Sequence, residues 1–210
     1  MRSVLVTGGT TRLGAAIAAR LRADGWRVLT SSHRADAGAD FAADLASPSG
    51  AVRLYAEVLQ RLDGQPPDAL VNNAALFTGS AEALEALNFE APKKLVMLMA
   101  GREDGRGSVV NILDTRVLRA ADEAEGAYAA SKRRLLDYTR QAAETYAETL
   151  CVNGVAPGPV LAPTEVHEQA GELLTTRPTP EDIAAAVSFL LGTPSVTGCI
   201  LPVDGGQHLL

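Results

Sequence analysis

The sequence that decides the fold class is Ser3-Val4-Leu5-Val6-Thr7-Gly8-Gly9-Thr10-Thr11-Arg12-Leu13-Gly14. Its first five residues form a mostly apolar run, which is typical of a strand buried on both faces of a parallel sheet. Beyond the glycines, Leu13, Ile17 and Leu21 recur at intervals of four and predict the buried face of a helix. Glycines in such a turn let the backbone approach a pyrophosphate, and the helix N-terminus supplies N–H donors. In the simpler interpretation, the glycines serve only the geometry of a tight strand-to-helix turn.

Strand-like and helix-like segments alternate along the rest of the chain. Further strands are predicted at residues 26–31, 69–71, 109–113, 150–155 and 199–201, and further helices at 48–62, 88–100, 127–149 and 183–191. Alternation of this kind implies βαβ units and a parallel sheet with helices on both faces, so the expected fold class is α/β. The sequence has no internal repeat, low-complexity tract or linker, and residues 1–210 are expected to form a single domain.

Composition narrows the classes of function. The net charge of −6 argues against a nucleic-acid footprint and against an anionic membrane surface. Cys151 and Cys199 lie in apolar runs, so buried free thiols in a reducing cytoplasm are expected rather than a disulfide. We find no secretory leader pattern and no apolar run of about 20 residues. The protein is therefore expected to be soluble and cytoplasmic, with a small-molecule substrate and no metal.

The stretch from Asn111 to Lys132 carries the candidate chemistry. An apolar run ends at Asp114, and Tyr128-Ala-Ala-Ser-Lys132 follows on a predicted helix. Residues four apart share a helix face, so Tyr128 and Lys132 can present a phenol and an ammonium to one ligand. The ammonium is expected to lower the phenol pKa from about 10 toward the working pH, as an acid–base catalyst requires. The alternative is an ordinary amphipathic helix with a surface lysine, because a single Tyr-x-x-x-Lys pattern is common by chance.

Two further segments concern ligand binding. Ser32-His33-Arg34 ends the second predicted strand, where a fold that prefers NAD would carry an acidic residue for the ribose 2′-hydroxyl. Together with Arg12 it predicts a cationic pocket for a 2′-phosphate, and hence NADP(H); a solvated turn is the alternative. Residues 159–178 contain many Thr and Pro residues with little periodicity, and we expect this long loop to close over the substrate.

Read together, the motifs resemble the short-chain dehydrogenase/reductase family over essentially the whole chain. The motifs are the Thr7-Gly8 turn, Asn72-Asn73-Ala74, Asp114, Tyr128-x-x-x-Lys132, Pro157-Gly158 and Val203-Asp204-Gly205-Gly206. The resemblance implies a Rossmann-type, doubly wound sheet, hydride transfer from a nicotinamide cofactor, and a homo-oligomer (dimer or tetramer). It implies a cofactor site formed by Thr7, Gly8, Arg12, Leu13, Gly14, His33, Arg34, Asp44, Leu45, Asn72, Ala74, Tyr128, Lys132, Pro157, Gly158 and Val160.

Departures from the family pattern resemble the pteridine reductase branch. The usual catalytic serine position holds Asp114, although the adjacent Thr115 leaves the alignment open by one residue, and Arg12 replaces the second glycine of the turn. In that branch an aromatic residue, here Phe77, stacks on the pterin, and the arginine contacts both cofactor phosphate and pterin. The resemblance therefore implies a substrate site of Arg12, Phe77, Asp114 and Tyr128 and a catalytic set of Asp114, Tyr128, Lys132 and Asn88.

The expected function is NADPH-dependent reduction of a pterin or a related C=N bond. Within the resemblance, Asn88 anchors a proton-relay water and Asp44 bonds the adenine amino group. The first alternative is a carbonyl reductase of the same family, acting on a 3-oxoacyl thioester or a small ketone. That alternative needs a catalytic hydroxyl, which Thr115 offers. The second alternative is a catalytically silent NADP(H)-binding sensor.

Overall fold

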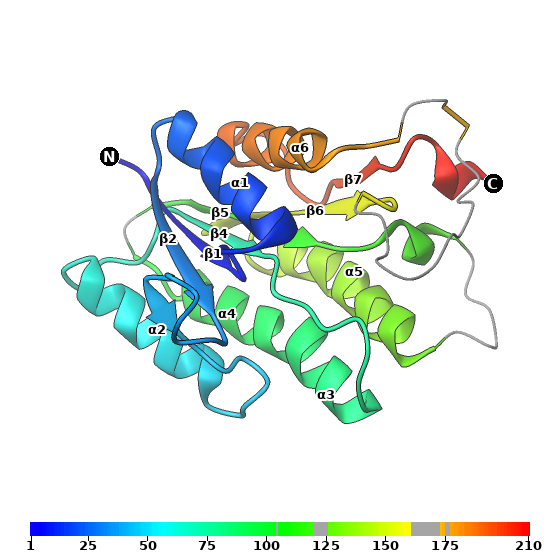
Figure 1. Cartoon of the computed structure of the whole chain (residues 1–210). Helices are drawn as coiled ribbons and strands as arrows, with labels where there is room; N and C mark the ends of the chain where they lie inside the picture. The colour runs from blue at the N-terminus through cyan, green and yellow to red at the C-terminus, as the bar shows by residue number, and fades with distance from the viewer. Residues whose placement is uncertain (104, 120–125, 161–172, 175–176) are drawn as a thin grey trace.

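A seven-stranded parallel sheet forms the centre of the molecule (Figure 1). The computed structural model describes residues 1–103, 105–119, 126–160, 173–174 and 177–210. The strands are β1 (Ser3–Thr7), β2 (Arg27–Ser32), β3 (Phe41–Ala42), β4 (Ala69–Asn72), β5 (Gly107–Ile112), β6 (Leu150–Pro157) and β7 (Ile200–Val203). They lie in the order β3-β2-β1-β4-β5-β6-β7, and each neighbouring pair is parallel. The predicted α/β fold is confirmed.

Helices cover both faces of this sheet (Figure 1). They are α1 (Arg12–Ala23), α2 (Gly50–Arg61), α3 (Ala81–Glu85), α4 (Ala91–Ala100), α5 (Ala127–Thr145) and α6 (Pro180–Gly192), with short turns η1 (Ala86–Glu90), η2 (Thr115–Leu118) and η3 (Gln207–Leu209). The cores of α1 and α6 pack on one face, and those of α2, α4 and α5 pack on the other. Leu5 and Val6, neighbours in β1, belong to different clusters, as expected for a strand buried on both faces.

The helix before the catalytic region begins earlier than predicted. The sequence pattern placed its start at residue 88, whereas helical structure begins at Ala81 and continues through η1 and α4 to Ala100. The Ser80 side chain accepts a hydrogen bond from the Ala83 amide at 3.2 Å and caps the start. Five residues in between, Ala86–Glu90, form a π-helical turn. Hydrophobic periodicity shifts by a residue across a π turn, so the regular pattern was recognised only from within this turn onward.

Other predicted bounds need smaller corrections. α5 ends at Thr145 rather than 149, because the chain must leave the helix at Tyr146 to enter β6 at Leu150. α2 covers Gly50–Arg61 rather than residues 48–62. β3 was not predicted, since two residues carry no periodicity. Cys151 is buried as expected, but Cys199 precedes β7 and is only partly buried; both thiols are free.

The carboxyl ends of the strands form the edge that positions the site. Chain order along the sheet reverses between β1 and β4, and ligands of open α/β sheets bind outside the strand ends at such a point. Thr7, Asn72 and Pro157 end strands that meet this edge. Most of the expected substrate loop, residues 161–172 and 175–176, lies outside the described residues. Within the part of the chain that the structure describes, no helix meets the length and hydropathy needed to cross a bilayer.

Candidate active site

The glycine-rich turn and the end of β4 are held together by a small hydrogen-bond cluster. The Thr7 hydroxyl accepts hydrogen bonds from the amides of Asn73 and Ala74, each at 3.0 Å. The Asn73 side-chain amide donates to the carbonyl oxygens of Thr7 at 2.9 Å and Gly8 at 3.1 Å. Asn73 therefore fixes the shape of the turn, a role that sequence reasoning did not assign to it.

The turn also fits a dinucleotide pyrophosphate. A Cβ on Gly14 would lie 2.0 Å from the Gly8 carbonyl oxygen, so only glycine allows this close packing. Gly8 and Arg12 adopt positive φ angles of 62° and 50°. Thr11, the N-cap residue of α1, makes no side-chain capping bond, which leaves the first amides of that helix available to an anion. Leu13 packs partly against the core below the turn.

Of the residues expected to bind a 2′-phosphate, Arg34 forms an ion pair within its own loop. Arg34 is directed to Asp36 in its own loop, with hydrogen bonds of 3.1 Å from Nε and 3.0 Å from an Nη atom. Both side chains are largely exposed, and such a surface pair contributes little stability. The pair can therefore open when a dianionic phosphate competes for the guanidinium. His33 and Arg12 are exposed at the same edge of the sheet.

The remaining expected cofactor residues lie on strand ends and the loops after them. Asp44 is exposed and accepts a hydrogen bond from the Ala46 amide at 3.0 Å, and Leu45 is buried. Gly158 packs so closely on Asp204 that a Cβ there would lie 2.8 Å from the Asp204 Cα atom. The expected cofactor residues that are buried or partly buried at this edge also include Asn72, Ala74, Pro157 and Val160.

Asp114 and Tyr128 face each other across the site. The Tyr128 hydroxyl donates a hydrogen bond to an Asp114 carboxylate oxygen at 3.0 Å. Asp114 is the N-cap of η2, and its other carboxylate oxygen accepts the Arg116 amide at 2.9 Å. The carboxylate is thus fixed at both oxygens. Asp114, rather than Thr115, occupies the position opposite the phenol.

Thr115 is turned away from the phenol and into the protein. It is buried, and its hydroxyl donates to Asp204 in the segment after β7. Asp204 also accepts the His208 amide at 2.8 Å and the Gly206 amide at 3.0 Å. Although burial acts in the opposite direction, these hydrogen bonds lower the pKa of Asp204. The Thr115 hydroxyl therefore serves the attachment of η2 to the C-terminal segment.

The pKa of Tyr128 moves in the direction opposite to the prediction. Burial raises it above the ordinary value of 10.0, and the charge of Asp114 and the hydrogen bond to that residue raise it further. Arg116 acts in the opposite direction by its positive charge. The prediction that Lys132 lowers the phenol pKa was wrong for this structure, because burial and the carboxylate dominate. The phenol keeps its proton at neutral pH.

Lys132 is buried one turn after Tyr128. Its ammonium donates a hydrogen bond to the Ile112 carbonyl oxygen at the end of β5, at 2.7 Å. Burial lowers the Lys132 pKa from 10.5 to about 8, partly offset by the charge of Asp114. A buried lysine costs stability, so a residue of this kind indicates a functional site.

Phe77 packs beside the Tyr128 phenol. Its ring centroid lies 4.7 Å from that of Tyr128 with the planes tilted by 54°, and 60% of Phe77 is exposed. The guanidinium of Arg116 lies 5.1 Å from the Phe77 ring and 5.6 Å from the Tyr128 ring. Sequence reasoning missed Arg116. The sequence does show a basic residue two positions after Asp114, and this spacing could have indicated a partner for the carboxylate.

Asn88 lies in the π-helical turn and is completely buried. Its side chain donates to the Leu76 carbonyl oxygen at 2.9 Å and accepts the Leu76 amide at 2.8 Å. It also donates to the Ser131 hydroxyl at 3.1 Å, and Ser131 in turn donates to the Tyr128 carbonyl oxygen at 2.7 Å. Asn88 therefore joins the segment before Phe77 to the first turn of α5. π turns occur frequently at functional sites.

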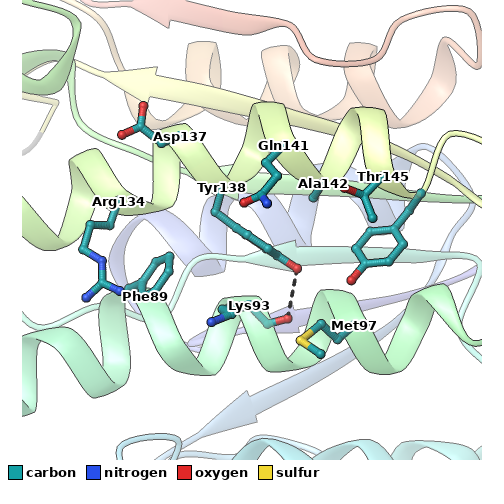
Figure 2. A pocket seen from close by; sticks show the side chains of 10 residues that line it. Phe89, Lys93, Met97, Arg134, Asp137, Tyr138, Gln141, Ala142 and Thr145 are labelled. Carbon is teal, nitrogen blue, oxygen red and sulfur yellow. Dashed lines mark hydrogen bonds between the residues drawn. The ribbon is translucent and has the colours of Figure 1, made fainter.

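A separate hollow lies between α4 and α5, away from the strand ends. Figure 2 shows Lys93 and Met97 on α4 opposite Arg134 and Tyr138 on α5. The hollow has a volume of about 510 Å³. The Tyr138 hydroxyl donates to the Lys93 carbonyl oxygen at 3.4 Å, and none of the expected catalytic residues lines this hollow.

Comparison with known proteins gives a consistent family assignment. The family model described as short chain dehydrogenase matches residues 2–173. Protein FixR of Bradyrhizobium diazoefficiens is 32% identical over 98% of this chain and 86% of its own length. The rhamnolipids biosynthesis 3-oxoacyl-[acyl-carrier-protein] reductase of Pseudomonas aeruginosa is also 32% identical, over 99% of this chain and 96% of that protein.

Pterin-related reductases are also among the similar proteins. The dihydromonapterin reductase of Escherichia coli is 29% identical over 98% of this chain and 96% of its own length. The crystal structure of FolM alternative dihydrofolate reductase 1 from Brucella canis, complexed with NADP, superposes with a TM-score of 0.86 at 30% identity. It covers 100% of this chain and 95% of that chain.

Proposed function

The chain belongs to the short-chain dehydrogenase family, and on that premise we propose that it is an NADPH-dependent reductase of a pterin or a related C=N substrate. The observation that carries the proposal is the 3.0 Å hydrogen bond from Tyr128 to Asp114, with the Thr115 hydroxyl directed elsewhere. Carbonyl reduction needs a neutral donor beside the phenol, because a negative charge repels the developing oxyanion. A carboxylate suits a substrate with ring nitrogens and N–H donors.

The cofactor is NADP(H). The residues of the turn fit a pyrophosphate, because Gly8 and Gly14 leave room for close approach and α1 begins without a side-chain cap. Arg12, His33 and Arg34 would hold the 2′-phosphate, and similar proteins of known structure are complexed with NADP. The cofactor supplies a hydride to the substrate carbon when it is bound.

The chain's own residues orient the substrate and deliver the proton. Tyr128 is protonated at neutral pH, and its one hydroxyl hydrogen, which is bonded to Asp114 in this structure, turns to the substrate nitrogen for the transfer and leaves a phenolate. Lys132 lies one turn away and stabilises the phenolate that results, because its ammonium is the opposite charge in a buried site. Phe77 offers an exposed aromatic face to a flat ring. Asp114 bonds the phenol and fixes its direction, and Asn88 supports the same helical turn.

A carbonyl reductase is the second candidate. A relative of 32% identity reduces 3-oxoacyl-[acyl-carrier-protein], according to its name, and Tyr128 and Lys132 would serve that reaction equally well. Against this candidate stands the carboxylate of Asp114, which occupies the position where the Thr115 hydroxyl would be needed.

An NADPH-oxidation assay separates the two candidates. We expect dihydrobiopterin or dihydrofolate to be reduced with a kcat/KM at least tenfold above that for an acetoacetyl thioester. Replacement of Tyr128 by Phe should lower kcat by about 100-fold or more, because general acid catalysis is lost, while the NADPH Kd changes little. Preferential turnover of the thioester would refute the pterin assignment. Full turnover by Tyr128→Phe would refute the catalytic role.

We also infer that the protein is a homo-oligomer that functions in the cytoplasm. The hollow between α4 and α5 has apolar side chains at its rim, including Met97, which is 43% exposed. The two free cysteines suit a reducing compartment.

A further inference from the structure

The proposed mechanism gives no role to Arg116, although this charged residue lies beside Asp114. Its Nε lies 3.5 Å from the Asp114 oxygen that also accepts the Arg116 amide. Its guanidinium lies within 6 Å of both the Phe77 and the Tyr128 rings, a distance at which cation–π attraction operates. One side chain thus contacts the carboxylate, the phenol ring and the exposed aromatic ring.

Other cations near the site bind backbone carbonyl oxygens. Lys132 comes from the same helix as Tyr128, but its ammonium is bound to the Ile112 carbonyl oxygen. Arg133 donates a hydrogen bond to the Val117 carbonyl oxygen in η2 at 3.0 Å, and Arg119 donates one to the Gln207 carbonyl oxygen in the C-terminal segment. Among the described charged groups, Asp114 and Arg116 act on the Tyr128 phenol with opposite signs.

The contacts of Arg116 match what the phenol needs in order to transfer its proton. One Asp114 oxygen accepts the phenol hydrogen bond, and the Arg116 amide binds the other. Because the second oxygen is bound, the carboxylate keeps the first oxygen directed at the phenol. The Arg116 amide donates to this second oxygen at the start of η2, and the Arg116 Nε lies 3.5 Å from the same oxygen. A planar guanidinium can contact two ring faces and a carboxylate together, which a lysine ammonium cannot do.

We propose that Arg116 is a positioning residue of the catalytic centre: its guanidinium fixes the Asp114 carboxylate and packs on Tyr128 and Phe77, so that the phenol is held in place beside the bound substrate. This inference rests on the proposed roles of Tyr128 and Asp114, through which Arg116 acts.

The test is kinetic and uses the full-length protein loaded with NADPH and dihydrobiopterin. Replacement of Arg116 by Gln should lower kcat about tenfold with little change in the NADPH Kd, since misplacement of a catalytic group affects the reacting complex most. Replacement by Lys should recover part of that loss, because the charge returns without the planar stacking. Arg140→Gln is the matched control: Arg140 is exposed on α5, and its loss changes the net charge equally.

A double-mutant cycle with Asp114→Asn separates positioning from a general structural effect. If Arg116 acts through Asp114, Arg116→Gln should cost several-fold less in the Asp114→Asn background than in the wild type. An equal loss in both backgrounds, or a kcat within about twofold of wild type for Arg116→Gln alone, overturns the proposal. If only the acetoacetyl thioester is turned over, the pterin assignment fails and the same cycle is measured with that substrate.

A readout without substrate covers the case in which no compound is turned over. With 3-fluorotyrosine incorporated, the ¹⁹F resonance of Tyr128 is assigned by its absence in Tyr128→Phe. We expect this resonance to shift in Arg116→Gln and to stay in place in Arg140→Gln. A shift without turnover supports the contact and rejects the proposed function, whereas an unchanged resonance rejects the role of Arg116.

Discussion

At the scale of single residues, the site contains two titratable groups whose pKa values depend on burial. Tyr128 is kept protonated by burial and by the carboxylate of Asp114, and Lys132 is made easier to deprotonate by burial. The same cause, burial, moves the two pKa values in opposite directions, because the charged form is the deprotonated phenol in Tyr128 and the protonated amine in Lys132. Sequence spacing predicted that they share a helix face but not how much water each would retain.

Lys132 gives a prediction about stability and pH. Its folded pKa of about 8 lies below the ordinary 10.5, so between these values the unfolded chain binds more protons and the stability of the wild type rises with pH. In Lys132→Met the side chain at this position does not titrate, so the stability of the variant lacks this rise with pH. The difference in unfolding free energy, wild type minus variant, should therefore increase by on the order of 3 kcal/mol from pH 7 to pH 10.5.

Urea unfolding of both proteins across this pH range measures the difference. Lys94→Met is the control, because Lys94 is exposed on α4 and its unfolding free energy should follow that of the wild type at every pH. A pH-independent difference for Lys132→Met would show that the lysine is not desolvated in the folded protein.

At the scale of elements, the decisive contacts join turns that are far apart in the chain. The turn after β1 is held by Asn73 after β4, and η2 is held by Asp204 after β7. Each catalytic or cofactor-binding segment is therefore fixed by a side chain from another βα unit. The segments follow the carboxyl ends of parallel strands, and only the sheet brings them together.

Gly14 provides a prediction at this scale. In Gly14→Ala, the new methyl group would meet the Gly8 carbonyl oxygen at 2.0 Å and the Asn73 amide nitrogen at 2.6 Å, so the turn must open. We expect the NADPH Kd to rise at least tenfold, or about 1.4 kcal/mol, in a fluorescence titration. The control is Gly192→Ala at the end of α6, where a Cβ meets no atom within 4 Å. Equal affinity of Gly14→Ala and wild type would exclude the turn from cofactor binding.

At the scale of the whole molecule, the exposed apolar surface concerns assembly. Met97 is 43% exposed beside the hollow on α4 and α5, whereas Val52, on α2, is 45% exposed elsewhere. In light scattering, we expect the wild type to be a dimer or tetramer and Met97→Glu to dissociate toward monomer, because a buried unpaired charge opposes association. Val52→Glu should keep the wild-type mass. A wild type that is monomeric at all concentrations would contradict the proposed oligomer.

The order of elements was fixed by local pattern. Apolar runs predicted six of the strands, and four-residue spacing predicted the core face of α1, because strand and helix periodicity are properties of neighbouring residues. The tyrosine–lysine spacing and the glycine turn were also local. These features were sufficient for the family assignment.

The tertiary structure decided what the sequence left open. It directed Asp114 rather than Thr115 to the phenol, because the Thr115 hydroxyl is bound by Asp204, 89 positions further along the chain. It reversed the expected pKa shift of Tyr128, since desolvation depends on everything packed around the ring. It brought Arg116 over two aromatic rings. These facts arise from contacts between distant segments and from exclusion of water, and neither is encoded in the spacing of adjacent residues.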